Sequence, residues 1–135
     1  ISGPVKPESG TLKSTGSPTV SGALTQYGDS TIEIAETKTL TYEGGAIEIG
    51  ASALSIIGGG NFANNGSALE LNNAASQLIF SRITVDYIRA TADSLGIVVD
   101  NTSTVTNFTV GHVTPVSISP NQSFNGLIEV YSNSN

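Results

Sequence analysis

The stretch GGAIEIGASALSIIGGGNFANNGSALELNNAASQLIF, residues 44–80, consists of very short apolar segments separated by glycine and asparagine. In each segment two apolar residues stand two positions apart, as Ile47 and Ile49 do, and then Leu54 and Ile56. Residues i and i+2 of a β-strand face the same side, so each pair is typical of a minimal strand with one buried face. The stretch therefore predicts a series of short strands, each ended by a turn residue.

The same pairing continues on both sides of this stretch. The further pairs are Ile32/Ile34, Leu40/Tyr42, Leu69/Leu71, Leu78/Phe80, Ile83/Val85, Ile97/Val99, Phe108/Val110 and Ile128/Val130. Aligning the resembling segments AIEIGASALSII, ALELNNAASQLIF, GIVVDNTSTVTNFTV and LIEVYSNSN makes Ile47, Leu69, Ile97 and Ile128 equivalent, with spacings of 22, 28 and 31 residues. Short strands at periods of about 20 to 50 residues indicate stacked repeats. The unequal spacing predicts surface-loop insertions at residues 87–94 and 112–125.

The turn residues fit a coil that bends sharply between its strands. Such bends often need a positive φ, which glycine adopts at no steric cost and asparagine at a lower cost than other residues. The asparagines can also hydrogen-bond along the coil as a ladder, or serve as ordinary turn residues. We interpret five residues as structural turn positions: Gly50, Asn72, Asn73, Asn101 and Asn133.

Residues 30–62, STIEIAETKTLTYEGGAIEIGASALSIIGGGNF, resemble the first turns of a right-handed parallel β-helix of the pectate-lyase type, including its glycine-rich step at residues 56–60. Phage tailspikes, polysaccharide lyases and hydrolases, and autotransporter-type bacterial adhesins use this fold. Residues 44–47 and 62–65 are also similar to the GGAI and FxxN elements of chlamydial polymorphic outer-membrane adhesins. The resemblance implies an all-β fold, a right-handed parallel β-helix (solenoid) of about four coils over residues 30–135.

Residues 1–29 differ from the rest, because residues 1–22 hold three prolines and almost no apolar periodicity. We predict an extended arm or linker here, either disordered or docked on a partner, that could cap the coil. Both ends of the solenoid would expose strand backbone, so we expect a homo-oligomer or additional domains to cap them. The chain begins with Ile rather than Met, which predicts a processed chain or a fragment.

The composition argues against several classes of function. A net charge of -6 argues against nucleic acid as a partner, because binding to nucleic acid depends on phosphate neutralisation. The chain has no Cys, no zinc-ligand spacing and no apolar run near the about 20 residues of a membrane span, so we expect no metal, cofactor or membrane span. The single histidine, His112, has no acidic neighbour in the sequence, and no catalytic residue is assigned.

Glu48 and Glu70 are the acidic pair that invites a catalytic interpretation. They occupy equivalent outward positions one coil apart, roughly 5 Å by strand spacing. Two such carboxylates could serve glycoside hydrolysis, or could simply be solvated side chains on a polar face. In the assumed alignment Val98 breaks their column, and Glu129 would join it only if the register slipped by one residue.

The segment VDYIRATAD, residues 85–93, concentrates charge and an aromatic ring in a chain with only 12% charged residues. Aromatic stacking with carboxylate and guanidinium hydrogen bonds suits sugars, which have an apolar face and a ring of hydroxyls. The alternative is an internal Arg–Asp pair with the tyrosine covering the edge of the core. The predicted carbohydrate-binding residues are Asp86, Tyr87, Arg89 and Asp93.

The predicted function is a non-catalytic structural or attachment module of a virion tailspike or fibre, which presents a polar solenoid face to host-surface glycans. Such a module would lie on the virion surface or on the extracellular cell surface. One alternative is a bacterial surface adhesin of the autotransporter kind. Another is the N-terminal fragment of a polysaccharide lyase or glycoside hydrolase whose site lies mostly outside this chain.

Overall fold

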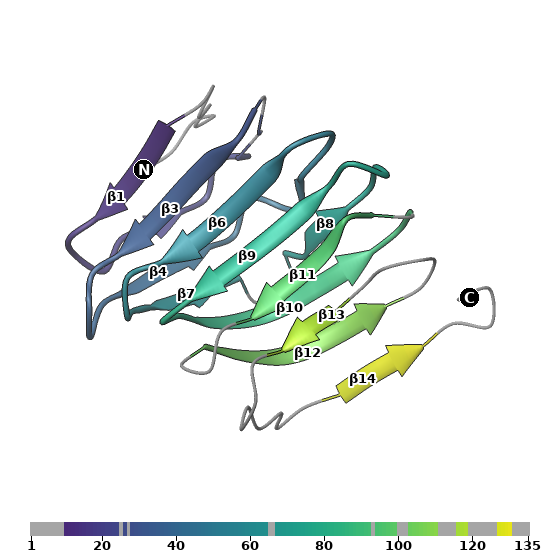
Figure 1. Cartoon of the computed structure of the whole chain (residues 1–135). Helices are drawn as coiled ribbons and strands as arrows, with labels where there is room; N and C mark the ends of the chain where they lie inside the picture. Colours follow the sequence, from purple (N-terminus) through teal and green to yellow (C-terminus); the bar gives the residue numbers. More distant parts are fainter. Residues whose placement is uncertain are drawn as a thin grey trace.

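The computed structural model describes residues 10–24, 26, 28–64, 67–92, 94–99, 103–110, 116–118 and 127–130. These residues form strands and turns without any helix, and the strands pair in parallel from one coil to the next. The chain is therefore a parallel β-solenoid (Figure 1). The predicted all-β, parallel β-helix fold is confirmed.

Two sheets run along the stack (Figure 1). The first has the order β1 (Gly10–Ser14), β3 (Ser30–Ile34), β6 (Ala53–Ile57), β9 (Gln77–Ser81), β11 (Gly96–Val99) and β13 (Val116–Ile118). The second has the order β2 (Thr19–Val20), β4 (Thr39–Tyr42), β7 (Asn61–Ala63), β10 (Thr84–Ala90), β12 (Thr104–Val110) and β14 (Leu127–Val130). Two short strands, β5 (Ile47–Glu48) and β8 (Leu69–Leu71), pair with each other, and β8 also pairs with β10. The coils that begin at β3, β6, β9 and β11 each have a neighbour on both sides, which makes about four complete turns.

The cross-section of the solenoid changes at β10. In the two preceding coils a corner separates β4 from β5 and β7 from β8, whereas β10 runs straight across and pairs with β7 at one end and β8 at the other. Asp86 and Tyr87 lie between these two paired halves. Both are half-buried and stand between the buried residues Val85 and Ile88, so the alternation of the strand is interrupted as in a β-bulge.

The interrupted strand corrects the predicted alignment of the coils. The equivalent residues are Ile47, Leu69, Ile88, Phe108 and Ile128, at spacings of 22, 19, 20 and 20 residues. The predicted equivalence of Ile97 is wrong, because Ile97 pairs with Leu78 in the first sheet. The predicted loop at 87–94 contains half of β10, and the one at 112–125 contains β13. At the bulge Ile88 follows the buried Val85 by three residues instead of two. The two-residue pattern in the sequence therefore does not reveal the second half of the strand.

Part of the range predicted as an arm, residues 1–29, forms strands. Within that range β1 and β2 form the first strands of the two sheets, with Leu12 in register with Ile32. Leu12 packs against the core, and Val20 and Leu24 are buried in it. These apolar residues are isolated among polar ones, so they form no pairs, yet strand pairing needs only the backbone groups.

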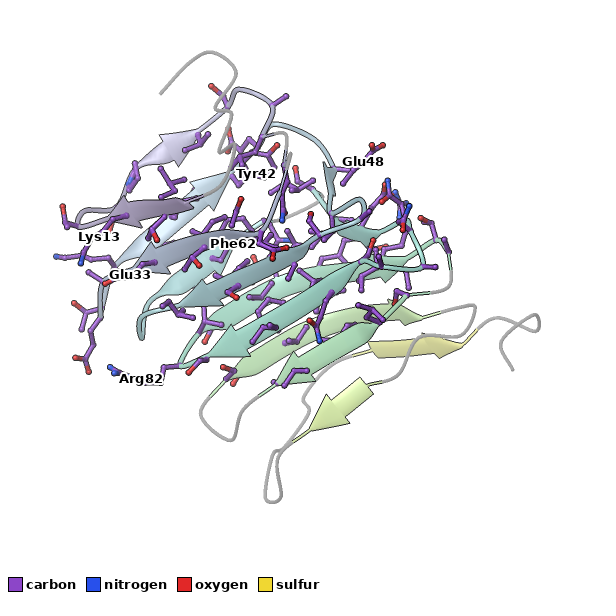
Figure 2. All side chains as sticks on the ribbon, turned by 45° about the horizontal axis from the view of Figure 1, so that its top comes forward. Lys13, Glu33, Tyr42, Glu48, Phe62 and Arg82 are labelled. Atoms are coloured by element: carbon purple, nitrogen blue, oxygen red, sulfur yellow. The ribbon has the colours of Figure 1, made fainter. Side chains whose placement is uncertain are left out.

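The core is a continuous stack of aliphatic side chains between the sheets, and it includes the buried rings of Tyr42, Phe62 and Phe80. The rings of Tyr42 and Phe62 are stacked, with centroids 6.2 Å apart and planes 18° apart (Figure 2). Both side chains are fully buried. The Tyr42 hydroxyl oxygen accepts a hydrogen bond of 2.9 Å from the Leu24 amide, so this buried polar group is satisfied.

The corner between β6 and β7 depends on glycine at two positions. A Cβ atom on Gly58 would lie 2.3 Å from the carbonyl oxygen of Ile34. A Cβ atom on Gly60 would lie 2.7 Å from the carbonyl oxygen of Ala35 and 2.7 Å from that of Lys38. Because backbone atoms cannot move aside, this is a tight step between coils that no larger residue can make.

The glycine and the asparagines at the predicted turn positions stabilise the turns in different ways. Gly50 has a φ of 62°, and its amide donates a hydrogen bond of 2.9 Å to Oδ1 of Asn72 in the next coil. Asn73 accepts a hydrogen bond from the Ala75 amide within its own turn. The described non-glycine residues with positive φ are Thr37 and Arg82, so Asn72 and Asn73 act through their side chains. Asn101 and Asn133 lie outside the described residues.

Candidate functional site

Three of the four predicted sugar-binding residues lie on β10. Asp86 and Tyr87 form the bulge, and Arg89 follows on the outward side with 42% of its side chain exposed. Asp93 lies outside the described residues, as does His112. The predicted residues are therefore brought together on the second sheet, in a strand rather than in a loop.

A column of charged residues crosses the second sheet at the end of β10. Arg89 is in register with Glu70 on β8, and Glu70 is in register with Glu48 on β5. Neighbouring members are therefore one strand spacing apart, about 5 Å. The same register continues to Thr109 and then Glu129, so Glu129 belongs to the column without any slip.

Val98 does not interrupt this column as predicted, because it lies on β11 in the other sheet. Val98 was assigned to this column because the two-residue pattern did not reveal the second half of β10. Once Ile88 is recognised as the buried residue of that coil, its neighbour Arg89 becomes the outward residue that follows Glu70.

Arg89 and Glu70 form an ion pair between Nη2 and Oε1. The Glu70 side chain is 11% exposed, so a guanidinium largely covers this carboxylate on the outside of the sheet. The sequence alternative was an internal Arg–Asp pair, and the observed partner is Glu70. Arg89 Nε is buried and has no hydrogen-bond partner among the described residues. Glu48, the outermost carboxylate, is exposed.

Asn64 holds the bulge in place from the preceding coil. Its side chain is fully buried, and its Oδ1 accepts hydrogen bonds from the amides of Asp86 (3.0 Å) and Tyr87 (3.2 Å). Its Nδ2 donates to the carbonyl oxygens of Tyr87 (2.7 Å) and Ser67 (2.9 Å). One amide side chain thus replaces the strand pairing that the bulge lacks. Sequence reasoning missed this role, because nothing in a single asparagine indicates which coil it will bond.

The environment of Asp86 is partly desolvated. Burial raises the pKa of its carboxyl above the ordinary value of 3.8, and a hydrogen bond with the backbone of Asn64 opposes that rise. Asp86 therefore contacts the same corner residue that supports its own amide. Both the main chain and the side chain of the bulge are fixed by the preceding coil.

The site combines an ion pair, an exposed carboxylate and a half-buried tyrosine on the second sheet. Glu70 is paired with Arg89 whereas Glu48 is exposed, so the two stacked carboxylates lie in different environments. No group of three or more His, Cys, Asp or Glu that could hold a metal occurs among the residues the structure describes. The same part of the chain contains no helix long and apolar enough to cross a membrane.

Comparisons with protein-family models, with curated proteins and with solved structures gave no match. The strands of successive coils are in parallel register throughout both sheets. That register supports a parallel β-solenoid of about four turns.

Proposed function

We propose that this solenoid is a non-catalytic attachment module of a virion tailspike or fibre, related to the pectate-lyase-like β-helices. Its contact surface for host glycans is the outward face of β5, β8 and β10. The observation that supports this role most is the column of Glu48, Glu70 and Arg89 beside Asp86 and Tyr87. It places hydrogen-bonding groups and an aromatic ring on one rigid sheet.

The chemistry of this face suits a sugar chain. Carboxylate and guanidinium groups exchange hydrogen bonds with hydroxyls, and a half-buried tyrosine offers its ring to an apolar sugar face. The Arg89–Glu70 pair and the Asn64 anchor hold these groups in fixed positions, which lowers the entropic cost of binding. Binding at one such face would be weak, and a homo-oligomer would raise it through multivalency.

The test is binding to an array of bacterial surface polysaccharides. Tyr87→Ala should lower binding by more than about tenfold, as expected for a central aromatic contact. Replacing Glu70 and Arg89 together by Ala should also lower it, without leaving a buried carboxylate unpaired. Lys13→Ala is the matched control, since Lys13 forms an ion pair of 3.0 Å with Glu33 on the outside of the other sheet. Equal binding by the control and by both site variants would refute the proposal.

A second candidate function is an N-terminal fragment of a polysaccharide-degrading enzyme, and stacking of Glu48 on Glu70 is the feature that favours it. The test is incubation with capsular polysaccharide and O-antigen, followed by detection of reducing ends and unsaturated products. Product formation that is lost in Glu48→Gln would favour the enzyme. A bacterial adhesin differs from a virion protein in its source and not in this site.

A further inference from the structure

A hollow of about 240 Å³ lies at the corner between the two sheets, at the start of β10. Its lining comes from three successive coils: Glu36 from the first, Gly59 and Gly60 from the second, and Arg82, Ile83 and Thr84 from the third. Figure 2 shows Arg82 at the opposite edge of the molecule from Glu48. The hollow is thus separate from Glu48, Glu70 and Arg89 of the charged column.

Gly59 lines the hollow between Arg82 and Glu36 with bare backbone. A Cβ atom there would lie 3.2 Å from Nη2 of Arg82 and 3.6 Å from Cβ and Cγ of Glu36. The space between a cationic and an anionic side chain is therefore left open over bare backbone. The Gly59 amide donates its hydrogen bond to the Arg82 carbonyl, so the floor is fixed to the coil above.

The backbone at this corner makes arginine an unexpected residue. Thr37, Gly59 and Arg82 all have positive φ, at 64°, 89° and 53°, so successive coils turn here through a left-handed residue. Glycine and asparagine adopt this conformation most readily, and the chain uses both freely. Arginine brings no advantage to the backbone. Its side chain places a guanidinium beside the hollow, and backbone outliers of this kind cluster at binding sites.

We propose that this hollow binds one neutral sugar ring, as a second contact for the glycan of the proposed function, on which the inference rests. Arg82 donates hydrogen bonds, Glu36 accepts them, and the Thr84 hydroxyl does both, which matches a ring of hydroxyls. The two charges of the walls cancel, and a protein with net charge -6 disfavours an acidic sugar. The volume lies below the roughly 300 to 1,000 Å³ of pockets for larger ligands, which suits a single ring.

The position of the hollow fits an extended ligand. Thr84 and Arg89 both lie on the outward side of β10, five residues apart, which is about 17 Å along a strand. An oligosaccharide that follows β10 can therefore contact the hollow at one end and the charged column at the other.

The experiment is an NMR titration of the ¹⁵N-labelled chain with glucose, galactose, mannose and glucuronate. At least one neutral hexose should give saturable shifts of the Gly59, Gly60 and Thr84 amides, and glucuronate should give none. Arg82→Asn keeps a residue that tolerates positive φ and removes the cation, so affinity should fall about tenfold or more while the unfolding midpoint is retained. Lys38→Asn is the matched control, because Lys38 is an exposed cation at the same corner that does not line the hollow.

The outcomes separate this inference from the proposed function. Shifts confined to residues 86–89 would support the proposed function and overturn the second contact. No shifts at the corner with any of the four sugars, shifts with glucuronate alone, or unchanged affinity in Arg82→Asn would each overturn it. If Arg82→Asn fails to fold, Thr84→Val provides the same test, since it removes one hydroxyl and keeps a β-branched strand residue.

Discussion

Replacement of Asn64 by alanine should destabilise the protein far more than an ordinary turn substitution. The side chain is fully buried and makes four hydrogen bonds, two to the amides of the bulge and two to carbonyl oxygens. A typical hydrogen bond contributes about 0.5–1.5 kcal/mol net, and a buried group left without a partner costs about 1–3 kcal/mol. Alanine cannot replace any of the four, so we expect a loss of about 3–5 kcal/mol.

The measurement is urea unfolding followed by far-UV circular dichroism, with the free energy taken from the midpoint and slope. Asn72→Ala is the matched control, because Asn72 accepts a single hydrogen bond from the Gly50 amide and should lose only about 1 kcal/mol. If the dependence of the unfolding free energy on urea concentration is unchanged in both variants, the surface area exposed on unfolding is also unchanged. Equal losses in the two variants would refute the role of Asn64 as the anchor of the bulge.

Three further perturbations test other parts of the structure. Gly60→Ala should prevent stable folding, because its Cβ would meet backbone carbonyls, whereas Gly16→Ala has open space and should change the thermal midpoint little. Arg89→Ala should lower the free energy of unfolding in urea by about 2–4 kcal/mol, because it leaves the covered Glu70 carboxylate without a partner. Replacing Arg89 and Glu70 together by alanine should lower it by less than the single change. The raised pKa of Asp86 means that the folded state holds this proton more tightly, so its contribution to stability falls as pH rises above 3.8 through the raised value. Asp86→Asn should remove that slope in unfolding free energies measured between acid and neutral pH, and identical pH profiles for the two proteins would contradict this assignment.

The sequence predicted the parts of the fold that depend on local pattern. Apolar pairs such as Ile32/Ile34 and Leu78/Phe80 identified strands correctly, because a two-residue period is a property of the strand itself. The glycine step at residues 58–60 was likewise recognisable from its composition.

The features that depend on contacts between coils could not be predicted in the same way. The bulge at Asp86 and Tyr87 broke the period and hid the strand that carries Arg89. Without that strand the register between Glu70 and Arg89 could not be found, although the two residues are the closest charged pair on this face. The role of Asn64 likewise becomes visible only when the next coil lies above it.

The change of cross-section at β10 has a consequence for how such a chain can lengthen. After β10 the residues in register recur every 20 positions, at Ile88, Phe108 and Ile128, and each of these strands pairs with the next in an unchanged register. Tandem duplication of one such 20-residue unit would add a coil that pairs with its neighbours without any other change of sequence. A coil inserted between β8 and β10 would need a second buried amide in the role of Asn64. Duplication of coils is therefore permitted after β10 and not at the junction of β8 and β10.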